Sequence, residues 1–281
     1  MPRLCLSGVI WRKQQVPDKI VEAAALVGYD PGMEKQRLDV LLAARGLAES
    51  REKAQRLILA GKVRVGGQTA DKAGRMVDAE ADVQVEAPER FVGRGGGKLE
   101  AAFEQFHLEV AGLVCIDIGA STGGFTDCLL QHGAARVYAV DVGHGQLDWR
   151  LRNDPRVVVK EGLNARYLRS EEVPEPVGFA VVDVSFISLT LILPPVTNLL
   201  LSGAQLVTLI KPQFEAGRAQ IGKGGVVRDP AVHAEVTARI KGFGTGSLPL
   251  EWLGVCESPL RGPAGNVEFL AWWKKRGEPK S

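Results

Sequence analysis

Apolar residues follow two different patterns along the 281-residue chain. In the first, within residues 34–86, helical spacing occurs over Arg37–Leu42 and again after Ser50, which is a good N-cap. Apolar and polar residues then alternate over residues 62–65, as they do in a half-buried strand. This pattern predicts a small α+β unit of two helices and a hairpin, which is closed by a strand at residues 83–85.

The second pattern starts near residue 93, where short apolar runs begin to alternate with helical segments such as Phe125–Gln131 and Ala231–Lys241. Alternation of this kind predicts a mostly parallel, doubly wound α/β sheet with helices on both faces. The runs that we expect to form strands are residues 114–118, 136–140, 157–159, 179–182, 205–210, 250–256 and 267–270.

The two patterns predict two domains, residues 34–86 and 93–281, with a linker at 87–92 and an N-terminal extension at 1–33. Hydrophobic residues make up 45% of the chain and charged residues 24%, which is typical of globular proteins. The four cysteines form no C-x-x-C pair, so no metal site is expected. The longest apolar stretch, residues 189–201, is too short to cross a bilayer, and the first residues make a poor secretory signal. We therefore expect a cytoplasmic protein.

Charge is segregated within the first domain, although the whole chain has a net charge of only +2. Residues 34–66 hold eight basic and four acidic residues, a net charge of +4, whereas residues 67–89 hold two basic and six acidic residues, a net charge of −4. A basic helix pair beside an acidic hairpin suits a phosphate backbone. A solvated helix face is the alternative explanation, and charge alone does not decide between the two.

The first domain resembles the small RNA-binding domain named after ribosomal protein S-four. The resemblance is carried by R-L-D from Arg37, S-R-x-x-A-x-x-L-I from Ser50 and G-x-V-x-V-x-G from Gly61. It implies RNA binding through the first two helices. The candidate phosphate contacts are Arg37, Arg51, Lys53 and Arg56.

A glycine-rich loop, D-I-G-A-S-T-G-G from Asp117, follows the first expected strand of the second domain. Gly119 and Gly123 allow backbone to approach a ligand closely, and Asp141, after the second strand, can accept the hydroxyls of a ribose. These features suit S-adenosylmethionine and nearly suit NAD, although Ser121 stands where the dinucleotide pattern has its second glycine. The loop also matches the G-x-S-x-G elbow of hydrolases, but that elbow usually follows several strands. A plain structural turn is the remaining alternative.

Two lysines and two carboxylates stand where strand ends or the domain entry would bring them together. Lys98 follows three glycines at the domain entry, Asp183 and Lys211 each end an apolar run, and Glu268 lies in the last run. Charges flanked by apolar strand residues are costly unless they are paired or used. The four residues could form two structural ion pairs, or they could act together in catalysis, and this pattern is compatible with both.

Residues 91–273 resemble the TlyA branch of the FtsJ-like ribose methyltransferases, a family also labelled haemolysin A. The resemblance is carried by the order Lys, Asp, Lys, Glu and by the segments IDIGASTGGFTDCLL, VDVGHGQL, VVDVSFISL, LIKPQFE and GKGGVVRDP. It implies a Rossmann-like methyltransferase fold, S-adenosyl-L-methionine as cofactor, and 2′-O-methylation of cytidine in ribosomal RNA or ribosomal subunits. One departure is Gly93, where relatives more often carry serine.

The resemblance assigns roles to the candidate residues. Lys211 would accept the proton of the 2′-hydroxyl, and Asp183 would orient the ammonium group of Lys211. Glu268 would hold Lys98 or the ribose in place. Asn164 would lie against the adenine, or would only cap a helix. The cofactor-binding candidates are Asp117, Gly119, Ser121, Gly123, Asp141, Asn164 and Asp183, and Arg94, Arg218 and Lys223 are further RNA contacts.

Two alternatives belong to other classes of function. A non-catalytic RNA-binding protein would have no need to keep all four charges of the candidate site. A cytolytic protein, as the haemolysin label suggests, would need a secretion signal or a pore-forming segment, and we find neither in the sequence. Among the aromatic residues, we expect Trp272 and Trp273 to pack in the last strand and Phe186 to lie in the core.

Overall fold

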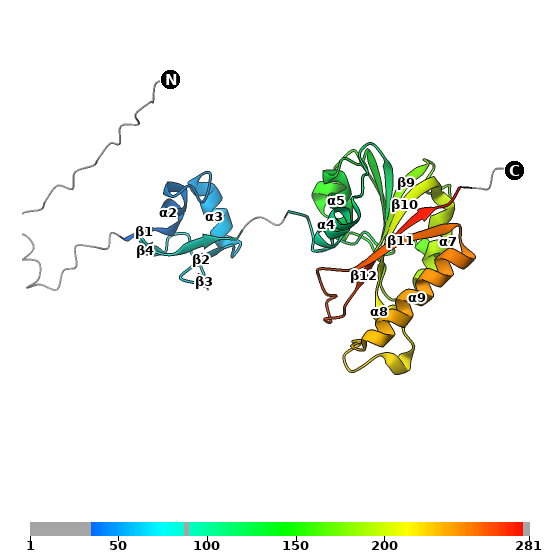
Figure 1. The fold of residues 1–281 in the computed structure, drawn as a ribbon. Coiled ribbons are helices and arrows are strands. Elements are labelled where there is room, and N and C mark those ends of the chain that lie inside the picture. The colour runs from blue at the N-terminus through cyan, green and yellow to red at the C-terminus, as the bar shows by residue number, and fades with distance from the viewer. Residues whose placement is uncertain (1–34, 87–89, 278–281) are drawn as a thin grey trace, which may run out of the picture. The chain divides into compact units, whose positions relative to one another are not determined.

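The structure is a computed structural model that describes residues 35–86 and 90–277 (Figure 1). These two ranges correspond to two compact units. The expected N-terminal extension at residues 1–33 and half of the expected linker, residues 87–89, lie outside the described residues. Within the two described ranges, no helix is long and apolar enough to cross a membrane.

The small unit joins two helices to two small sheets, as the first pattern predicts. Ser50 caps the second helix, because its hydroxyl accepts a hydrogen bond from the backbone nitrogen of Lys53 at 3.2 Å. Leu38, Leu42 and Ile58 are fully buried between the helices and the strands. The elements are β1 (Lys35–Arg37), α2 (Leu38–Ala44), α3 (Arg51–Leu59), β2 (Val63–Val65), β3 (Gln68–Thr69), β4 (Met76–Asp78) and β5 (Val83–Val85). Strand β2 pairs with β3 and β5, and β1 pairs with β4.

The large unit is built on a seven-stranded sheet, which confirms the predicted α/β architecture. Its strands are β6 (Val114–Ile118), β7 (Arg136–Val140), β8 (Val157–Lys160), β9 (Val177–Val182), β10 (Leu200–Ile210), β11 (Leu250–Glu257) and β12 (Phe269–Lys275). Their order is β11-β12-β10-β9-β6-β7-β8. The strands β6 to β10 are parallel, and β12 is antiparallel to both of its neighbours.

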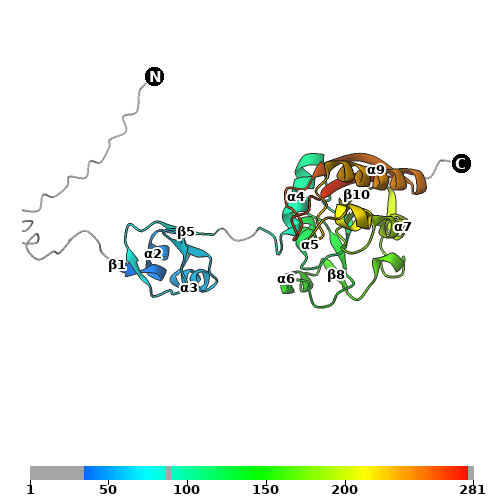
Figure 2. The same cartoon turned by 90° about the horizontal axis from the view of Figure 1, so that it is seen from below.

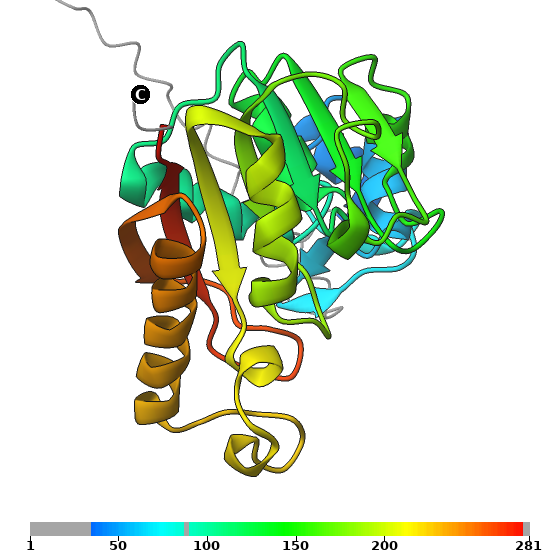
Figure 3. The same cartoon turned by 90° about the vertical axis from the view of Figure 1, so that its right-hand side faces the viewer.

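Helices cover both faces of this sheet (Figures 2 and 3). Leu99 and Leu129, from α4 and α5, belong to the core on one face, whereas Ile192 and Val236, from α7 and α9, belong to the core on the other. The helices are α4 (Gly95–Phe106), α5 (Gly124–Gln131), α6 (Trp149–Arg152), α7 (Leu189–Leu199), α8 (Pro212–Glu215) and α9 (Pro230–Ser247), with 3-10 turns at Ala165–Tyr167 and Arg218–Gln220.

The order of the strands reverses between β6 and β9. From β6 the chain continues through β7 to β8 on one side, and the next strand, β9, lies on the other side. In open α/β sheets, ligands bind beyond the carboxyl ends of the strands at such a reversal. The glycine-rich loop after β6 and the loop after β9 therefore frame the expected ligand site.

Two sequence expectations need correction. The last strand begins at Phe269, two residues later than expected, so Glu268 lies directly before the strand instead of within it. Trp273 is fully buried and Trp272 is half-buried in this strand, as predicted. The prediction that Phe186 is a core residue is wrong, because its side chain is 90% exposed. Phe186 follows the end of β9, beyond the layers that cover the sheet, and its ring contacts that of Phe214, with ring centroids 4.9 Å apart.

Candidate active site

The glycine-rich loop after β6 needs its glycines for close approach. Gly119 has φ +87°, and a Cβ atom there would lie 2.4 Å from the carbonyl oxygen of Asp183. Ser121 has φ +50°, a conformation that non-glycine residues seldom adopt. Its backbone nitrogen donates to Oδ2 of Asp141 at 2.8 Å, which stabilises this turn of the loop. The loop is therefore held against the ends of both β7 and β9.

All four charged candidates line one cavity of about 290 Å³ at the carboxyl ends of the strands. They meet as two ion pairs: Lys98 Nζ lies 2.5 Å from Oε2 of Glu268, and Lys211 Nζ lies 2.6 Å from Oδ1 of Asp183. Lys211 Nζ also donates to the hydroxyl of Ser185 at 3.0 Å. The structure thus brings together four side chains that are spread over 170 positions of the sequence.

These ion pairs are buried but incompletely satisfied. Lys98 and Lys211 are 9% and 8% exposed, and Glu268 is 1% exposed. Oδ1 of Asp183 makes no hydrogen bond, so its contact with Lys211 is a close ionic one. Buried charges are costly unless they are paired or used. The site can hold a polar group between two amines and two carboxylates.

A second cavity, of about 420 Å³, adjoins the first and shares Gly119, Ser121, Asp183 and Ser185 with it. Its volume lies within the range of roughly 300–1,000 Å³ that is usual for small-molecule sites. Asp141 lines it, and its Oδ2 and Oδ1 accept backbone hydrogen bonds at 2.8 and 2.7 Å, which leaves one lone pair on each oxygen. The cavity therefore fits a nucleoside whose ribose hydroxyls donate to Asp141, as S-adenosylmethionine would require.

Two of the predicted cofactor residues line neither cavity. Asp117 is fully buried beneath the loop, where Oδ2 accepts a hydrogen bond from Thr126 Oγ1 at 2.7 Å and Oδ1 has no partner. Burial raises the pKa of Asp117 to about 7, against the lowering effect of the Thr126 hydrogen bond. A Cβ atom at Gly123 would lie 2.2 Å from Leu151, so this glycine permits packing against α6. Both residues support the loop from behind.

Asn164 caps a 3-10 turn, as one of the two alternatives expected, and it also faces a cavity of the site. Its Oδ1 accepts a hydrogen bond from the backbone nitrogen of Arg166 at 3.0 Å, which caps the 3-10 turn Ala165–Tyr167. The same residue lines the larger of the two site cavities. A capping role and a ligand contact are compatible, because the capping hydrogen bond leaves the amide NH₂ group to donate elsewhere.

The motif analysis missed Ser185 as a site residue and misplaced Phe186. Ser185 lines both cavities and contacts Lys211, and Phe186 lines the larger cavity with φ +63°. A non-glycine residue held in this region and exposed to solvent is a common feature of binding sites. The available signal was their position directly after Asp183, at the carboxyl end of a central strand.

The predicted RNA contacts fall into two groups in the large unit. Arg94 lines the smaller cavity beside Lys98. It follows Gly93, where a Cβ atom would lie 2.5 Å from Thr122 Oγ1, so a serine at this position would require Thr122 to move. Arg218 and Lys223 are exposed in the segment after α8 and line no cavity of the large unit's site.

In the small unit, two of the predicted RNA contacts have a structural task as well. Arg37 and Arg51 place Nε 3.0 and 2.9 Å from the carboxylate oxygens of Asp39, which is fully buried. Both arginine side chains are still about half exposed, at 45% and 51%. Lys53 and Arg56 are exposed on α3. All four cations therefore remain accessible to a phosphate backbone.

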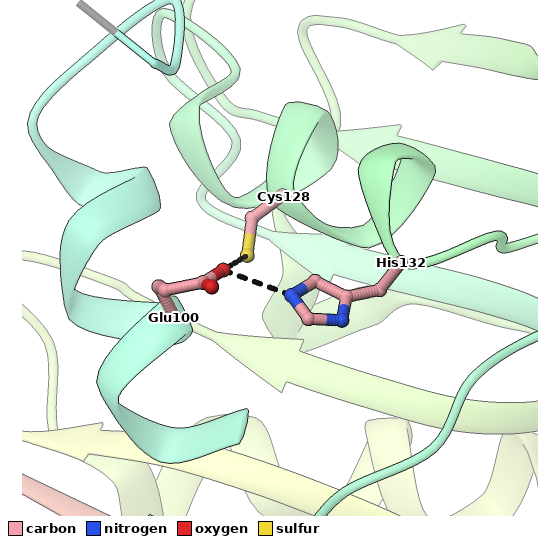
Figure 4. Close-up of side chains that lie close together, drawn as sticks. All are labelled: Glu100, Cys128 and His132. Atoms are coloured by element: carbon pink, nitrogen blue, oxygen red, sulfur yellow. Dashed lines mark hydrogen bonds and ion pairs between the residues drawn. The ribbon is translucent and has the colours of Figure 1, made fainter. Parts of the chain in front are cut away.

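Glu100, Cys128 and His132 form a further cluster between α4 and α5 (Figure 4). One ligand atom of each lies within 4.8 Å of the others, a donor set that zinc accepts. Glu100 is already bonded, however: His132 Nε2 lies 2.8 Å and Cys128 Sγ 3.6 Å from Oε2, and Arg90 donates to Oε1 at 2.6 Å. Burial raises the pKa of the Cys128 thiol, so the sulfur stays protonated. These contacts fasten α4, which carries Lys98, to α5.

Sequence reasoning did not find this cluster, because Glu100 lies 28 residues before Cys128. The i, i+4 spacing of Cys128 and His132 was the only local signal, and it is weak without a third ligand nearby in the sequence.

Comparisons with known proteins cover both units. The FtsJ-like methyltransferase family matches residues 91–275, and the S4 domain matches residues 36–83. YqxC of Bacillus subtilis, named a candidate rRNA methyltransferase, is 51% identical over 242 residues, which cover 84% of this chain and 85% of that protein. The 16S/23S rRNA (cytidine-2′-O)-methyltransferase TlyA of Mycobacterium tuberculosis is 49% identical over 85% of this chain and 89% of its own. A solved structure from Streptococcus thermophilus, named a candidate hemolysin, is 46% identical with a TM-score of 0.67, over 88% of this chain and 90% of that one.

Proposed function

This chain belongs to the FtsJ-like methyltransferase family, and we propose that it transfers a methyl group from S-adenosylmethionine to the 2′-hydroxyl of a cytidine in ribosomal RNA. One relative, whose match covers 85% of this chain and 89% of its own, is named for this reaction. A ribosomal RNA substrate would place the reaction in the cytoplasm, on naked rRNA or on a ribosomal subunit.

One observation carries the proposal: Lys98, Asp183, Lys211 and Glu268 line a single cavity, which shares a wall with a cavity of nucleoside size. Asp183 and Ser185 belong to both. A methyl group at the shared wall would face the charged side chains, and a ribose in the smaller cavity would lie in line with it. Holding two reactants in such geometry supplies a large part of the acceleration in transfer reactions.

When bound, S-adenosylmethionine supplies an electrophilic methyl group on a sulfonium centre. Lys211 acts on the other reactant: as a neutral amine, Nζ accepts the proton of the 2′-hydroxyl while the oxygen attacks. Asp183, 2.6 Å away, then faces the ammonium that forms, and Ser185 holds Nζ in place. The Lys98 ammonium, oriented by Glu268, stabilises the developing negative charge on the ribose oxygen.

The target nucleotide must leave its stack to reach this cavity. Phe186 offers an exposed aromatic face at the edge of the site, and Arg94 offers a guanidinium in the smaller cavity. Bases that leave the stack are commonly held by aromatic side chains, and phosphates by arginine. We assign Phe186 to the flipped base and Arg94 to a neighbouring phosphate, while Arg37 and the cations of α3 bind the rRNA elsewhere.

The experiment is methyl transfer from tritiated S-adenosylmethionine to ribosomal RNA of each subunit, naked and assembled, followed by mapping of 2′-O-methylation. The expected product is 2′-O-methylcytidine at a site that is unmodified in cells without the protein. Label on a base would contradict the ribose as acceptor. RNA binding without any label would favour the non-catalytic alternative.

A further inference from the structure

An open groove of about 980 Å³ lies between α9 and the β11–β12 hairpin. Its floor is apolar, with Val255, Phe269 and the half-buried Trp252. Arg228 and Lys241 are exposed cations on its walls. The methyltransferase chemistry described above makes no use of it.

This groove continues the catalytic cavity. Arg261 lines both the groove and the cavity that holds the four charged residues. Arg261 lies in the segment that connects β11 to β12, and Glu268 closes the same segment just before β12 begins. A strand whose nucleotide entered the catalytic cavity would therefore pass Arg261 and enter the groove.

The charges of the groove suit a polyanion. Arg228, Lys241 and Arg261 are all exposed, and none of them forms an ion pair with another described residue. Arg261 donates only to the carbonyl oxygen of Gly265, at 3.3 Å. Glu257 is the single carboxylate among the lining residues. Three unpaired cations around an apolar floor leave a net positive surface, which attracts phosphates.

The aromatic floor favours a single strand over a duplex. The ring of Trp252 packs against the ring of Trp273 in a T-shaped contact, with an interplanar angle of 86° and centroids 4.6 Å apart, and this contact holds Trp252 in place. Lys241 Nζ lies 5.6 Å from the centroid of the same indole. Grooves that bind single-stranded nucleic acid combine cations along the backbone with aromatic rings under the bases. A duplex keeps its bases stacked inside and would not reach this floor.

We propose that the groove between α9 and β11 binds the single-stranded rRNA next to the target nucleotide, with Arg228, Lys241 and Arg261 on its phosphates and Trp252 against a base. This inference rests on the proposed function, since it assumes that RNA is the substrate. It adds a binding site on the methyltransferase unit itself, separate from the cations of the small unit.

The test compares the double variant Arg228→Ala, Lys241→Ala with the control Arg169→Ala, Lys274→Ala, in which two other exposed cations that line none of these cavities lose the same charge. We expect the groove variant to weaken affinity for a single-stranded rRNA fragment about tenfold, and to reduce the slope of log affinity against log salt by about 2. The KM for rRNA should rise equally, with kcat and cofactor affinity unchanged.

Affinity and salt slope are read from RNA binding alone, so they report on the groove even if no methyl transfer occurs. Equal RNA affinities of the groove variant and its control would overturn the proposal that the groove binds RNA. If the wild-type protein still transferred methyl groups to rRNA, the proposed function would stand. A second measurement uses 4-thiouridine next to the target nucleotide. Crosslinks to Trp252 or to residues 228–241 are expected, and crosslinks confined to other segments would also overturn the proposal.

Discussion

Asp39 in the small unit and Glu268 in the large unit are both buried carboxylates that pair with cations, but their surroundings differ. Asp39 accepts side-chain hydrogen bonds from Arg37, Arg51 and Gln55. The backbone nitrogen of Val40 donates to it as well. These hydrogen bonds, that of Arg37 first, hold the pKa of Asp39 well below its usual range. Every acceptor position of Asp39 is used by the protein.

Glu268 has one strong partner, Lys98 at 2.5 Å, and its other oxygen lies 3.5 Å from Nε2 of Gln213. It borders a cavity of about 290 Å³ together with the second ion pair, Lys211 and Asp183. Burial and opposite charge are thus common to both units. The two carboxylates differ in the number of their hydrogen-bond partners and in their access to a cavity. Asp39 is fully used by the fold, whereas Glu268 borders a cavity that a substrate could enter.

The strongest test of this distinction is Lys211→Ala. If Lys211 is the base, the variant should lose methyl transfer by a factor of about 10²–10⁴, because that is the usual contribution of a positioned proton acceptor. Cofactor affinity, measured by calorimetry, should stay close to that of the wild type, whereas thermal stability should fall, because Asp183 loses its ion-pair partner. Transfer within tenfold of the wild-type rate would refute the assignment of the base.

The sequence pointed to four charged residues that the structure brings to one cavity, because strand ends in an α/β sheet converge at one edge. It also predicted the strands of the large sheet and two of its helices, α5 and α9, since hydrophobic periodicity encodes these directly, whereas the reversal between β6 and β9 is known only from the structure. The pairing of Lys211 with Asp183, and of Lys98 with Glu268 or the ribose, came from the family resemblance, because hydrophobic periodicity says nothing about side-chain positions across the sheet; the structure has the pairs Lys211–Asp183 and Lys98–Glu268. Phe186 was misplaced for a related reason: apolar character predicts burial only where another layer covers the residue.

Asp117 is an intermediate case, because it is fully buried like Asp39 but has one oxygen without a partner. Burial raises its pKa to about 7. The folded state therefore binds this proton more tightly than the unfolded state, and the resulting stability is lost as the pH rises from about 4 to 7. Asp117→Asn should remove that loss. The free energy of unfolding of the wild type should therefore fall relative to that of the variant by up to about 1.4 kcal/mol per pH unit in this window.

Thermal or urea unfolding of both proteins at several pH values measures the difference. The same variant with Thr126→Val as a second change controls for the hydrogen bond between Thr126 and residue 117. Parallel pH profiles of the wild type and Asp117→Asn would show that the buried carboxyl does not carry the expected proton.

Glu268→Gln should have a smaller effect on the reaction, because it keeps the shape of the side chain and removes only its charge. Lys98 would lose its anionic partner and its fixed orientation, and we expect methyl transfer to fall by roughly 10–100-fold. The unfolding temperature should fall as well, because the buried Lys98 ammonium loses its charged partner. A loss of folding with kcat retained in the remaining folded protein would place Glu268 with Asp39, as a structural carboxylate, and would blur the distinction between the two units.

The smallest expected effect is that of Asp39→Asn, which should act on the small unit alone. An amide in place of the carboxylate weakens the hydrogen bonds of two arginines that are themselves half exposed, so we expect a loss of about 1–2 kcal/mol. Four of the five tryptophans lie in the large unit, at positions 149, 252, 272 and 273. Circular dichroism should thus show an unfolding transition at a lower temperature, while the transition seen by tryptophan fluorescence should stay where it is. The control Asp71→Asn, at an exposed carboxylate of the same unit, should shift neither transition. A shift of the fluorescence transition would mean that Asp39 supports more of the molecule than the unit whose helices it joins.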